Sequence, residues 1–271
     1  GWFVNNTIKQ KAKLIRELEP KLTGILKDGE EVLYVAKGVR HSFLEAMFMG
    51  ALWANLMNQT VFVLTNARML MFQTNSKGTP KHSIWMIYYS EVSKMTNSWT
   101  GTMQLNLADK KGITLAGFPK ADRKQMVSIF EEARENYQRT GFEPECSQSM
   151  ENVCNFCYEI VPKKQFECDG CGATFWKPSE LAMRSLIFPS WGDILMKHYL
   201  FAAFEMFGYL LGLLVVLAVT FGGGPNQDPI ELILVPTVFF LTAHVADAGI
   251  TFLVANKGLN PRQAPPVEDQ D

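Results

Sequence analysis

Two long apolar stretches near the end of the chain limit its possible folds more than any other feature. Residues 199–221 read YLFAAFEMFGYLLGLLVVLAVTF, and residues 232–254 read LILVPTVFFLTAHVADAGITFLV. A helix needs about 20 predominantly apolar residues to cross the hydrocarbon core of a bilayer. We therefore expect a two-helix transmembrane hairpin over residues 199–255. A pair of helices buried in a soluble core is the alternative.

The charges beside these stretches predict an orientation. Lys177, Arg184 and Lys197 precede the first stretch, and Lys257 and Arg262 follow the second. The connecting sequence FGGGPNQDPIE contains no Lys or Arg. Because Lys and Arg favour the cytoplasmic side of a membrane, we expect a multi-pass protein of the cell's inner (cytoplasmic) membrane. Both the N-terminus and the C-terminus are predicted to lie in the cytoplasm.

Four cysteines form two Cys-x-x-Cys pairs separated by ten residues: Cys154, Cys157, Cys168 and Cys171. Disulfides are disfavoured in a reducing cytoplasm, whereas four thiolates at this spacing are typical of a tetrahedral zinc site. Such a site has no open coordination position, so it cannot activate water. The spacing therefore predicts a zinc ribbon over residues 153–178 with a structural Zn as its cofactor. Cys146 lies outside this spacing.

Other functions find little support in the composition. The ribbon carries Lys163, Lys164 and Lys177 against Glu159, Glu167 and Asp169, with Glu151 just before it, and the whole chain has a net charge of -1. Nucleic-acid binding normally requires a basic surface, so we expect no nucleic-acid partner. The chain contains no phosphate-binding loop, dinucleotide fingerprint or catalytic Ser/His/Asp set. We therefore expect that the protein is not an enzyme.

The first 140 residues change from a helical to a strand-like pattern. Residues 6–27 carry apolar residues at helical spacing, with Pro20 expected to kink or split the helix. These residues are Ile8, Ala12, Ile15, Leu18, Leu22 and Ile25. Beta-branched and aromatic runs then alternate with turn residues, which predicts strands. These runs cover residues 31–39, 60–74 (broken by an Asn-Ala turn), 82–89, 102–109 and 112–118. A closing helix over residues 121–139 places Met126, Ile129, Phe130 and Ala133 on one face.

The stretch TVFVLTNARMLMFQTNSKG, followed by IYYSEVSKM, resembles the bacterial pleckstrin-homology-like family. Lipid-binding domains of the GRAM type share these motifs. This resemblance implies a seven-stranded half-open barrel with a C-terminal helix, acting as a binding or assembly module. The later segment FWKPSELAMRSLIFPSWGDILMKHYLFAAFEMFG resembles membrane proteins that join a zinc ribbon to paired spans.

These expectations define an α+β multidomain membrane protein with seven parts. They are an N-terminal helical segment (1–27), a pleckstrin-homology-like barrel (28–140), a linker (141–152), the zinc ribbon (153–178), a membrane-proximal amphipathic segment (179–198), the transmembrane hairpin (199–255) and a disordered cytoplasmic tail (256–271).

One segment of the expected barrel is unusually apolar. Residues 42–57 include Phe43, Phe48, Leu52 and Trp53, and only Glu45 among them is charged. A helix packed over the open end of the barrel would explain this pattern. An interfacial helix or a subunit contact is the alternative, because exposed apolar patches mark interaction surfaces.

Three ionisable residues fall within the apolar stretches: Glu205, His244 and Asp247. Their positions predict a similar depth near the cytoplasmic end of the hairpin. Intramembrane ionisable groups suggest a proton path, an ion site or a polar lock between helices, and we favour the lock. Gly208 and Gly212 have the spacing that allows two helices to approach closely.

The sequence thus predicts a non-enzymatic, membrane-anchored binding or assembly protein. Its expected partners are the lipid bilayer and a protein, either another protein or a second copy of this chain. An accessory subunit of a transporter or an electron-transfer assembly is the first alternative. A small oligomeric protein that conducts ions or protons is the second.

Overall fold

The computed structural model describes residues 2–222 and 229–266 and divides the chain into two compact units. Unit 1 comprises the residues up to Phe175 together with those from Pro261 onward. Unit 2 is Trp176–Asn260. Each unit is described by itself. The transmembrane hairpin expected over 199–255 falls in unit 2, except that its connecting residues 223–228 lie outside the described residues.

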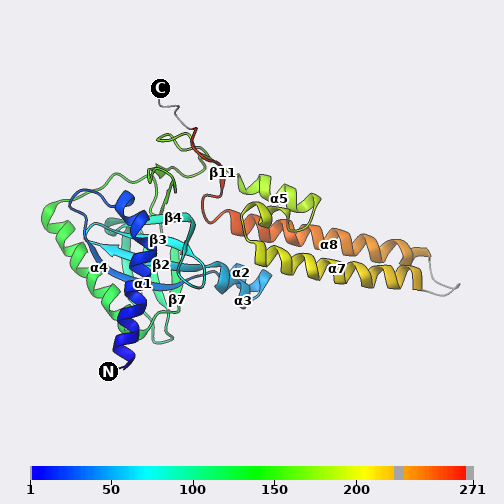
Figure 1. Ribbon diagram of the computed structural model, residues 1–271, viewed down its shortest axis with the longest axis horizontal. Helices are drawn as coiled ribbons and strands as arrows, with labels where there is room; N and C mark the ends of the chain where they lie inside the picture. The colour runs from blue at the N-terminus through cyan, green and yellow to red at the C-terminus, as the bar shows by residue number, and fades with distance from the viewer. Residues whose placement is uncertain (1, 223–228, 267–271) are drawn as a thin grey trace. The chain divides into compact units, whose positions relative to one another are not determined.

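Unit 1 is built on one antiparallel sheet of nine strands, in the order β5-β6-β7-β1-β2-β3-β4-β8-β9 (Figure 1). Strand β1 pairs with both β2 and β7, so it joins the two halves of the sheet. The bounds are β1 Val32–His41, β2 Gln59–Thr65, β3 Arg68–Thr74, β4 Pro80–Tyr88, β5 Val92–Asn97, β6 Met103–Leu107, β7 Gly112–Ala116, β8 Glu151–Val153 and β9 Ile160–Val161. A short 3-10 turn, Tyr89–Glu91, precedes β5.

The predicted strand runs agree with the strands at all five places, including the break at Asn66 and Ala67 between β2 and β3. Strand β5 was not among those runs. Its buried residues Val92 and Met95 are three apart, because the pairing register with β6 shifts between Val92 and Lys94. This irregularity removes the period of two by which a half-buried strand is recognised in a sequence.

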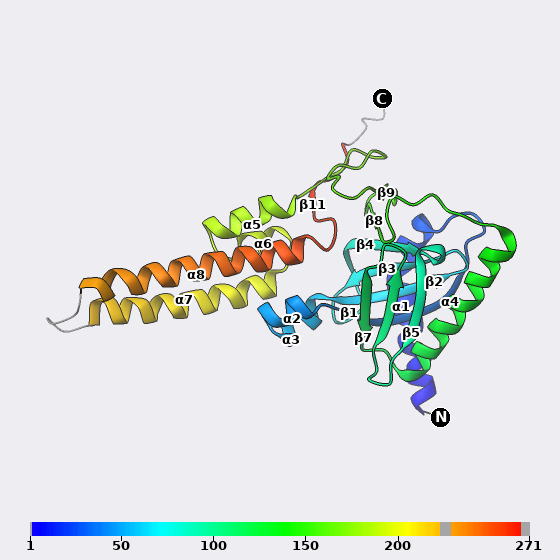
Figure 2. The same cartoon turned by 180° about the vertical axis from the view of Figure 1, so that it is seen from behind.

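A helix covers each face of the sheet, as the views from front and back show (Figures 1 and 2). Helix α4, Lys120–Thr140, buries Met126, Ile129, Phe130 and Ala133 in one hydrophobic core, the face that the sequence predicted. Helix α1, Trp2–Ile25, packs on the opposite face and contributes to a second core. The strands are therefore buried on both sides, and unit 1 is a mixed α/β structure.

Helix α1 differs from the expected separate N-terminal segment. Its buried residues Leu14, Leu18, Leu22 and Ile25 follow a spacing of four, four and three, which places them on one helix face. The helix continues through Pro20. Ile8 and Ile15, which the periodicity had placed on the same face, are exposed because they lie on the solvent side of this stripe.

A buried ion pair fastens the end of α1 to the sheet. Arg68 lies at the start of β3 and pairs with Glu30 at 2.9 Å, with both side chains 3% exposed. The same guanidinium donates a hydrogen bond to the carbonyl oxygen of Ile25 at 2.8 Å. The hydroxyl of Thr65 donates to Glu30 at 2.7 Å. The LTNAR sequence thus brings its Thr and Arg to one acidic partner.

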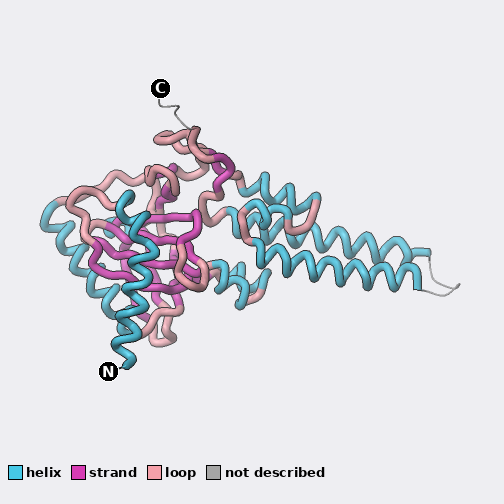
Figure 3. Tube along the Cα trace, viewed as in Figure 1, coloured by secondary structure: helices cyan, strands magenta, loops and turns pink. Residues whose placement is uncertain are grey.

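Unit 2 is helical (Figure 3). It consists of α5 Pro178–Ile187, α6 Trp191–Leu195, α7 Tyr199–Gly222 and α8 Pro229–Ala255. Helix α8 packs against α5 and α7. Tyr209 of α7 stacks on Phe239 of α8 with ring centroids 5.6 Å apart. Helices α7 and α8 are long and apolar enough to cross a membrane.

We predict that Leu18→Ala destabilises unit 1, because Leu18 is 0% exposed at the centre of the α1 face. A Leu-to-Ala change in a core lowers the free energy of unfolding by about 2–5 kcal/mol. Ile15→Ala is the matched control, since Ile15 is 45% exposed, and a surface change of this kind stays within about 0.5 kcal/mol.

Proteolysis of the purified full chain over a range of urea concentrations measures both variants. Equal destabilisation by the two substitutions would contradict the packing of α1 described above.

Candidate functional site

The first cysteine pair lies at an edge of the sheet of unit 1. Strand β8 pairs with β4 and ends immediately before Cys154. The chain then turns tightly, with the Tyr158 amide donating to the Cys154 carbonyl at 3.0 Å, and returns as β9. Tyr158 adopts a positive φ of 64° in this turn. The sheet therefore positions Cys154 and Cys157 directly.

The second cysteine pair sits in a similar turn. The amide of Gly172 donates to the Cys168 carbonyl at 2.7 Å, and the Cys168 amide donates to the Ala173 carbonyl at 2.9 Å. Gly172 has a φ of 70°, a left-handed conformation that glycine adopts without a steric penalty. Strand β10, Thr174–Phe175, follows and pairs with β11, Pro261–Gln263.

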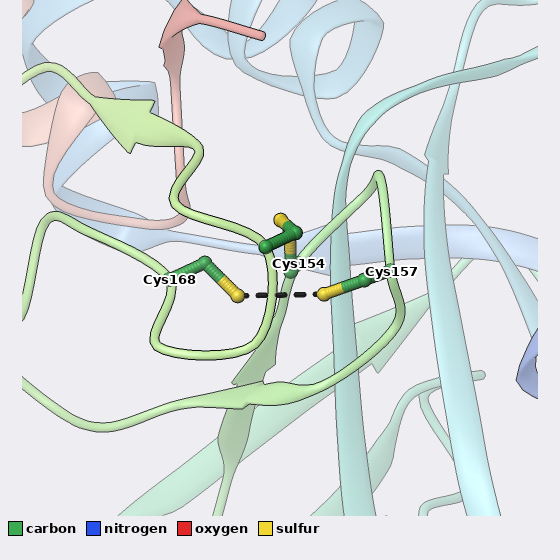
Figure 4. A group of neighbouring side chains, drawn as sticks. Cys154, Cys157 and Cys168 are labelled. Atoms are coloured by element: carbon green, nitrogen blue, oxygen red, sulfur yellow. Dashed lines mark hydrogen bonds between the residues drawn. The ribbon is translucent and has the colours of Figure 1, made fainter. Parts of the chain in front are cut away.

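The two turns bring all four thiols together. The sulfur atoms of Cys157 and Cys168 are 3.4 Å apart (Figure 4). Those of Cys154 and Cys171 are 3.7 Å apart. Four sulfurs bound tetrahedrally at about 2.3 Å from one zinc ion lie about 3.8 Å from one another. The four-sulfur set therefore fits a closed tetrahedral metal site, and Cys146 is not part of it.

Burial raises the pKa of two of the four thiols, so it favours their protonated form when no cation is bound. Burial raises the pKa of Cys154 to about 11, and burial together with the neighbouring thiols raises the pKa of Cys157. A metal ion that binds here must displace these protons, so its binding is coupled to proton release.

Residues 153–175 of the expected ribbon are part of unit 1 rather than a separate unit. The buried carboxylate of Glu151 accepts hydrogen bonds from the amides of Ser147 and Gln148 at 2.5 and 2.9 Å, which orders the expected linker. Tyr158 packs on Gly24 of α1, where a β-carbon would lie 2.4 Å from its ring. Residues 261–263, expected within a disordered tail, form β11 because the edge of β10 offers them backbone partners.

The apolar segment at 42–57 forms two short helices, α2 Phe43–Met49 and α3 Ala51–Met57, separated by Gly50 at a φ of 86°. Their side chains exposed within the chain form what we call the apolar patch: Phe43, Leu44, Met47, Phe48, Leu52 and Leu56. Phe43 and Leu52 are 73% and 70% exposed. Trp53 is half-buried and lies outside the patch.

The one charged side chain of this segment turns inward. Glu45 is buried and accepts a hydrogen bond from the Asn58 side chain at 2.5 Å. Its charge is therefore removed from the surface that carries the patch.

In unit 2, Glu205 and Asp247 come together with Asp193, a residue that the sequence interpretation did not select. One carboxylate oxygen of each lies within 4.8 Å of the others. We call these three residues the acidic group. Asp193 comes from α6, Glu205 from the second turn of α7 and Asp247 from the last third of α8.

His244 makes different contacts from those expected. Its Nδ1 donates to the carbonyl oxygen of Leu186 at 2.7 Å, and its Nε2 accepts from the Tyr209 hydroxyl at 3.2 Å. His244 lies three residues from Asp247 in α8, about 4.5 Å along the helix axis. At that position Leu186 and Tyr209 bond both of its ring nitrogens, so His244 is not part of the acidic group.

The two glycines selected from α7 have unlike surroundings. A β-carbon on Gly212 would lie 2.4 Å from the ring of Phe239, so α7 and α8 approach closely there. Gly208 has nothing within 4 Å of such an atom.

Two further residues, which the sequence did not indicate as candidates, lie at the acidic group. His198 immediately precedes α7 and is 7% exposed, and Ser190 is fully buried at a φ of 66°. The Ser190 amide donates to Asp247 at 2.8 Å. The signal that could have indicated them is the sequence SWGDILMKH, in which polar residues stand directly before an apolar helix.

No known protein family and no curated protein matches this chain. Three solved structures are similar to part of it. A structure titled "Crystal structure of the C-terminal domain of an unknown protein from Leishmania infantum" is 15% identical, with a TM-score of 0.30, and the match covers 44% of this chain and 92% of that one. A structure titled "Vps36 N-terminal PH domain" is 17% identical, with a TM-score of 0.31, covering 42% and 86%.

The third structure, titled "Crystal Structure of the Linker-DH/PH domains of p115-RhoGEF", is 9% identical with a TM-score of 0.30, and the match covers 49% of this chain and 42% of that one. Structures that contain PH domains are thus among the neighbours. The strand order and the two hydrophobic cores of unit 1 define it as a large antiparallel sheet with a helix on each face.

We expect the purified full chain to contain about one zinc ion bound by the four cysteines, following the four-thiolate rule. Cys168→Ala, which removes a buried ligand, should abolish binding and destabilise unit 1. Elemental analysis by mass spectrometry measures the zinc, and a chelator should release it with the same loss of stability.

Cys146→Ala is the control, because Cys146 lies outside the cluster. Protein prepared under reducing conditions that carries no metal would rule out the zinc ribbon.

Proposed function

We propose that this chain is a non-enzymatic binding or assembly protein, anchored by α7 and α8 in the cell's inner membrane, with unit 1 in the cytoplasm. The observation that carries the proposal is the surface of the two helices. Only 17% and 22% of their most apolar windows are buried within the chain. Core helices of a soluble protein bury most of their apolar residues, whereas membrane helices present them to lipid.

The strand order of unit 1 and the helix that follows β7 support a pleckstrin-homology-like half-open barrel. The sheet and two helices supply a rigid body, and the proposed zinc ion fixes the two cysteine turns to each other. A closed four-thiolate site supports a structural role for this metal.

The apolar patch supports a protein contact. Six large apolar side chains are exposed there, and patches of this kind commonly mark interaction sites. Residues 42–57 contain no Lys or Arg, although helices that lie on a membrane surface usually carry them on their polar face. We therefore favour a protein over a lipid surface, with a second copy of the chain as the simplest partner.

We predict that Leu211→Arg with Leu214→Arg prevents stable membrane insertion, because both side chains of α7 are exposed within the chain. An Arg near the centre of a spanning helix is unfavourable by about 3 kcal/mol at each position. Resistance of the chain to extraction with alkaline carbonate measures insertion.

Ile15→Arg is the control, since it places the same charge on an exposed position of α1. An unmodified chain that carbonate extracts completely would contradict the anchor. Alkaline phosphatase fused after Gly222 should be active and should be inactive at the C-terminal end, because the flanking Lys and Arg favour a cytoplasmic location.

We further predict that Phe43→Glu, Phe48→Glu and Leu52→Glu together abolish self-association while unit 1 stays folded, because the three side chains are exposed rather than part of either core. The mass of the chain in lipid nanodiscs, measured by light scattering, should fall to that of one copy.

Ile8→Glu with Ile15→Glu is the matched control, since it adds acidic residues at exposed apolar positions of α1. An unchanged multiple-copy mass in the triple variant would rule out the patch as the contact. A single-copy mass of the unmodified chain would rule out self-association.

A further inference from the structure

In the part of the chain that the structure describes, the acidic group has no Lys or Arg to balance its charge, and its two aspartates are buried. Asp193 is 0% exposed and Asp247 is 7% exposed. Among the described residues, no Lys or Arg forms an ion pair with any of the three carboxylates. Carboxylates removed from water require a counter-charge or full hydrogen bonding. The hydrogen bonds of each oxygen therefore show whether the group needs a cation.

The protein donates a hydrogen bond to two of the carboxylate oxygens of the acidic group. Asp247 Oδ2 accepts from the Ser190 amide at 2.8 Å, and Asp193 Oδ2 accepts from the Thr251 hydroxyl at 3.1 Å. The other oxygens, Asp193 Oδ1 and Asp247 Oδ1, are buried without a hydrogen-bond partner, and so is Glu205 Oε2. Each aspartate thus has one oxygen held in place and one without a partner, and Glu205 adds a third oxygen without a partner.

The imidazole of His198 provides an independent observation. His198 is 7% exposed, and neither Nδ1 nor Nε2 has a hydrogen-bond partner. Its Nδ1 lies 3.5 Å from the free Oδ1 of Asp193, so the imidazole faces this carboxylate at a distance longer than a good hydrogen bond. Buried polar groups normally have partners, and an unpartnered imidazole beside unpartnered carboxylates is arranged as a set of ligands.

We propose that Asp193, Glu205, Asp247 and His198 bind one divalent first-row transition-metal ion such as Mn²⁺. The ion would accept the three free carboxylate oxygens and one nitrogen of His198. Mixed carboxylate and imidazole ligands suit such ions, whereas Mg²⁺ and Ca²⁺ favour sites made of oxygen alone. No thiol is present, which separates this site chemically from the four cysteines of unit 1.

Supporting residues orient the ligands, as is usual around metal sites. Thr251, which donates to Asp193, is itself bonded to the Ser185 hydroxyl at 2.8 Å, and Ser185 accepts from the Gly192 amide at 3.0 Å. A β-carbon on Gly192 would lie 2.4 Å from Thr251 and 2.9 Å from the Leu181 carbonyl oxygen. The close approach of α6 to α5 and α8 therefore brings Asp193 to Asp247.

The ion would join α6, α7 and α8, because each of these helices contributes one carboxylate. It would also offset two of the three negative charges of the acidic group. This inference stands on unit 2 alone and holds whether or not the proposed function is correct.

Mn²⁺ itself is the probe, because it prefers oxygen and nitrogen ligands over thiolates. We expect the purified full chain in detergent to bind one Mn²⁺ in an electron paramagnetic resonance titration and to gain thermal stability on binding. Asp193→Asn, Asp247→Asn and His198→Gln should each weaken binding at least tenfold and abolish the thermal gain. The Asn variants remove charge without changing side-chain size, and circular dichroism checks their fold.

Two controls separate this site from others. His244→Gln changes a neighbouring imidazole that has its own partners and should leave Mn²⁺ affinity unchanged. Cys171→Ser should lose zinc but keep Mn²⁺. Should any variant fail to fold, the remaining two decide the outcome.

The proposal is overturned if the unmodified chain shows no saturable Mn²⁺ binding, or if all folded variants bind as well as it does. A metal-free chain that becomes more stable with Asp193→Asn or Asp247→Asn, and binds no Mn²⁺, would show a hydrogen-bonded carboxyl cluster instead.

Discussion

The buried ion pair between Arg68 and Glu30 is the interaction on which the rest of unit 1 depends. Its guanidinium also bonds the last carbonyl of α1 at Ile25, so one side chain joins a strand, a loop and a helix end. Burial alone would raise the pKa of Glu30, but hydrogen bonds from Arg68, the Lys27 amide and Thr65 lower it. The stabilisation is therefore present at neutral pH and is lost as the pH falls through that lowered value. Tyr158 of the first cysteine turn packs on Gly24 of the same helix, so the four-cysteine cluster contacts the helix that this ion pair attaches.

In unit 2, by contrast, buried carboxylates lie together without a Lys or Arg partner among the described residues. Arg68 and Glu30 satisfy each other, whereas Asp193, Glu205 and Asp247 share a small space and leave oxygens without partners. Removing one partner from a buried pair is strongly destabilising, by about 3–5 kcal/mol. A group that begins without a counter-charge persists only where a proton or a cation supplies it. The first arrangement is complete within the chain, and the second is suited to a ligand.

The sequence predicted those features that short segments determine. The strand runs, the α4 face and the length of α7 and α8 follow from residue spacing, which the backbone periods of two and 3.6 convert directly into faces. Strand β5 did not follow, because a register shift at Val92 removes its period. The α1 face was only half predicted, since Ile8 and Ile15 fit a helical period as well as Leu14 does. Packing against the sheet determines which of these apolar residues are buried.

The sequence by itself determined the four-cysteine cluster, because the pairwise spacing places two sulfurs in each tight turn. It also determined the two apolar helices, because length and composition are local properties. The tertiary structure alone decided which residues meet around Asp247. His244 is three residues away in the same helix but turns to α5 and Tyr209, whereas Asp193 and His198 arrive from α6 and the start of α7. Such a meeting depends on the rotation and contact of separate helices, and their rotations are fixed by packing at positions such as Gly192 and Gly212 rather than by the spacing of the polar residues.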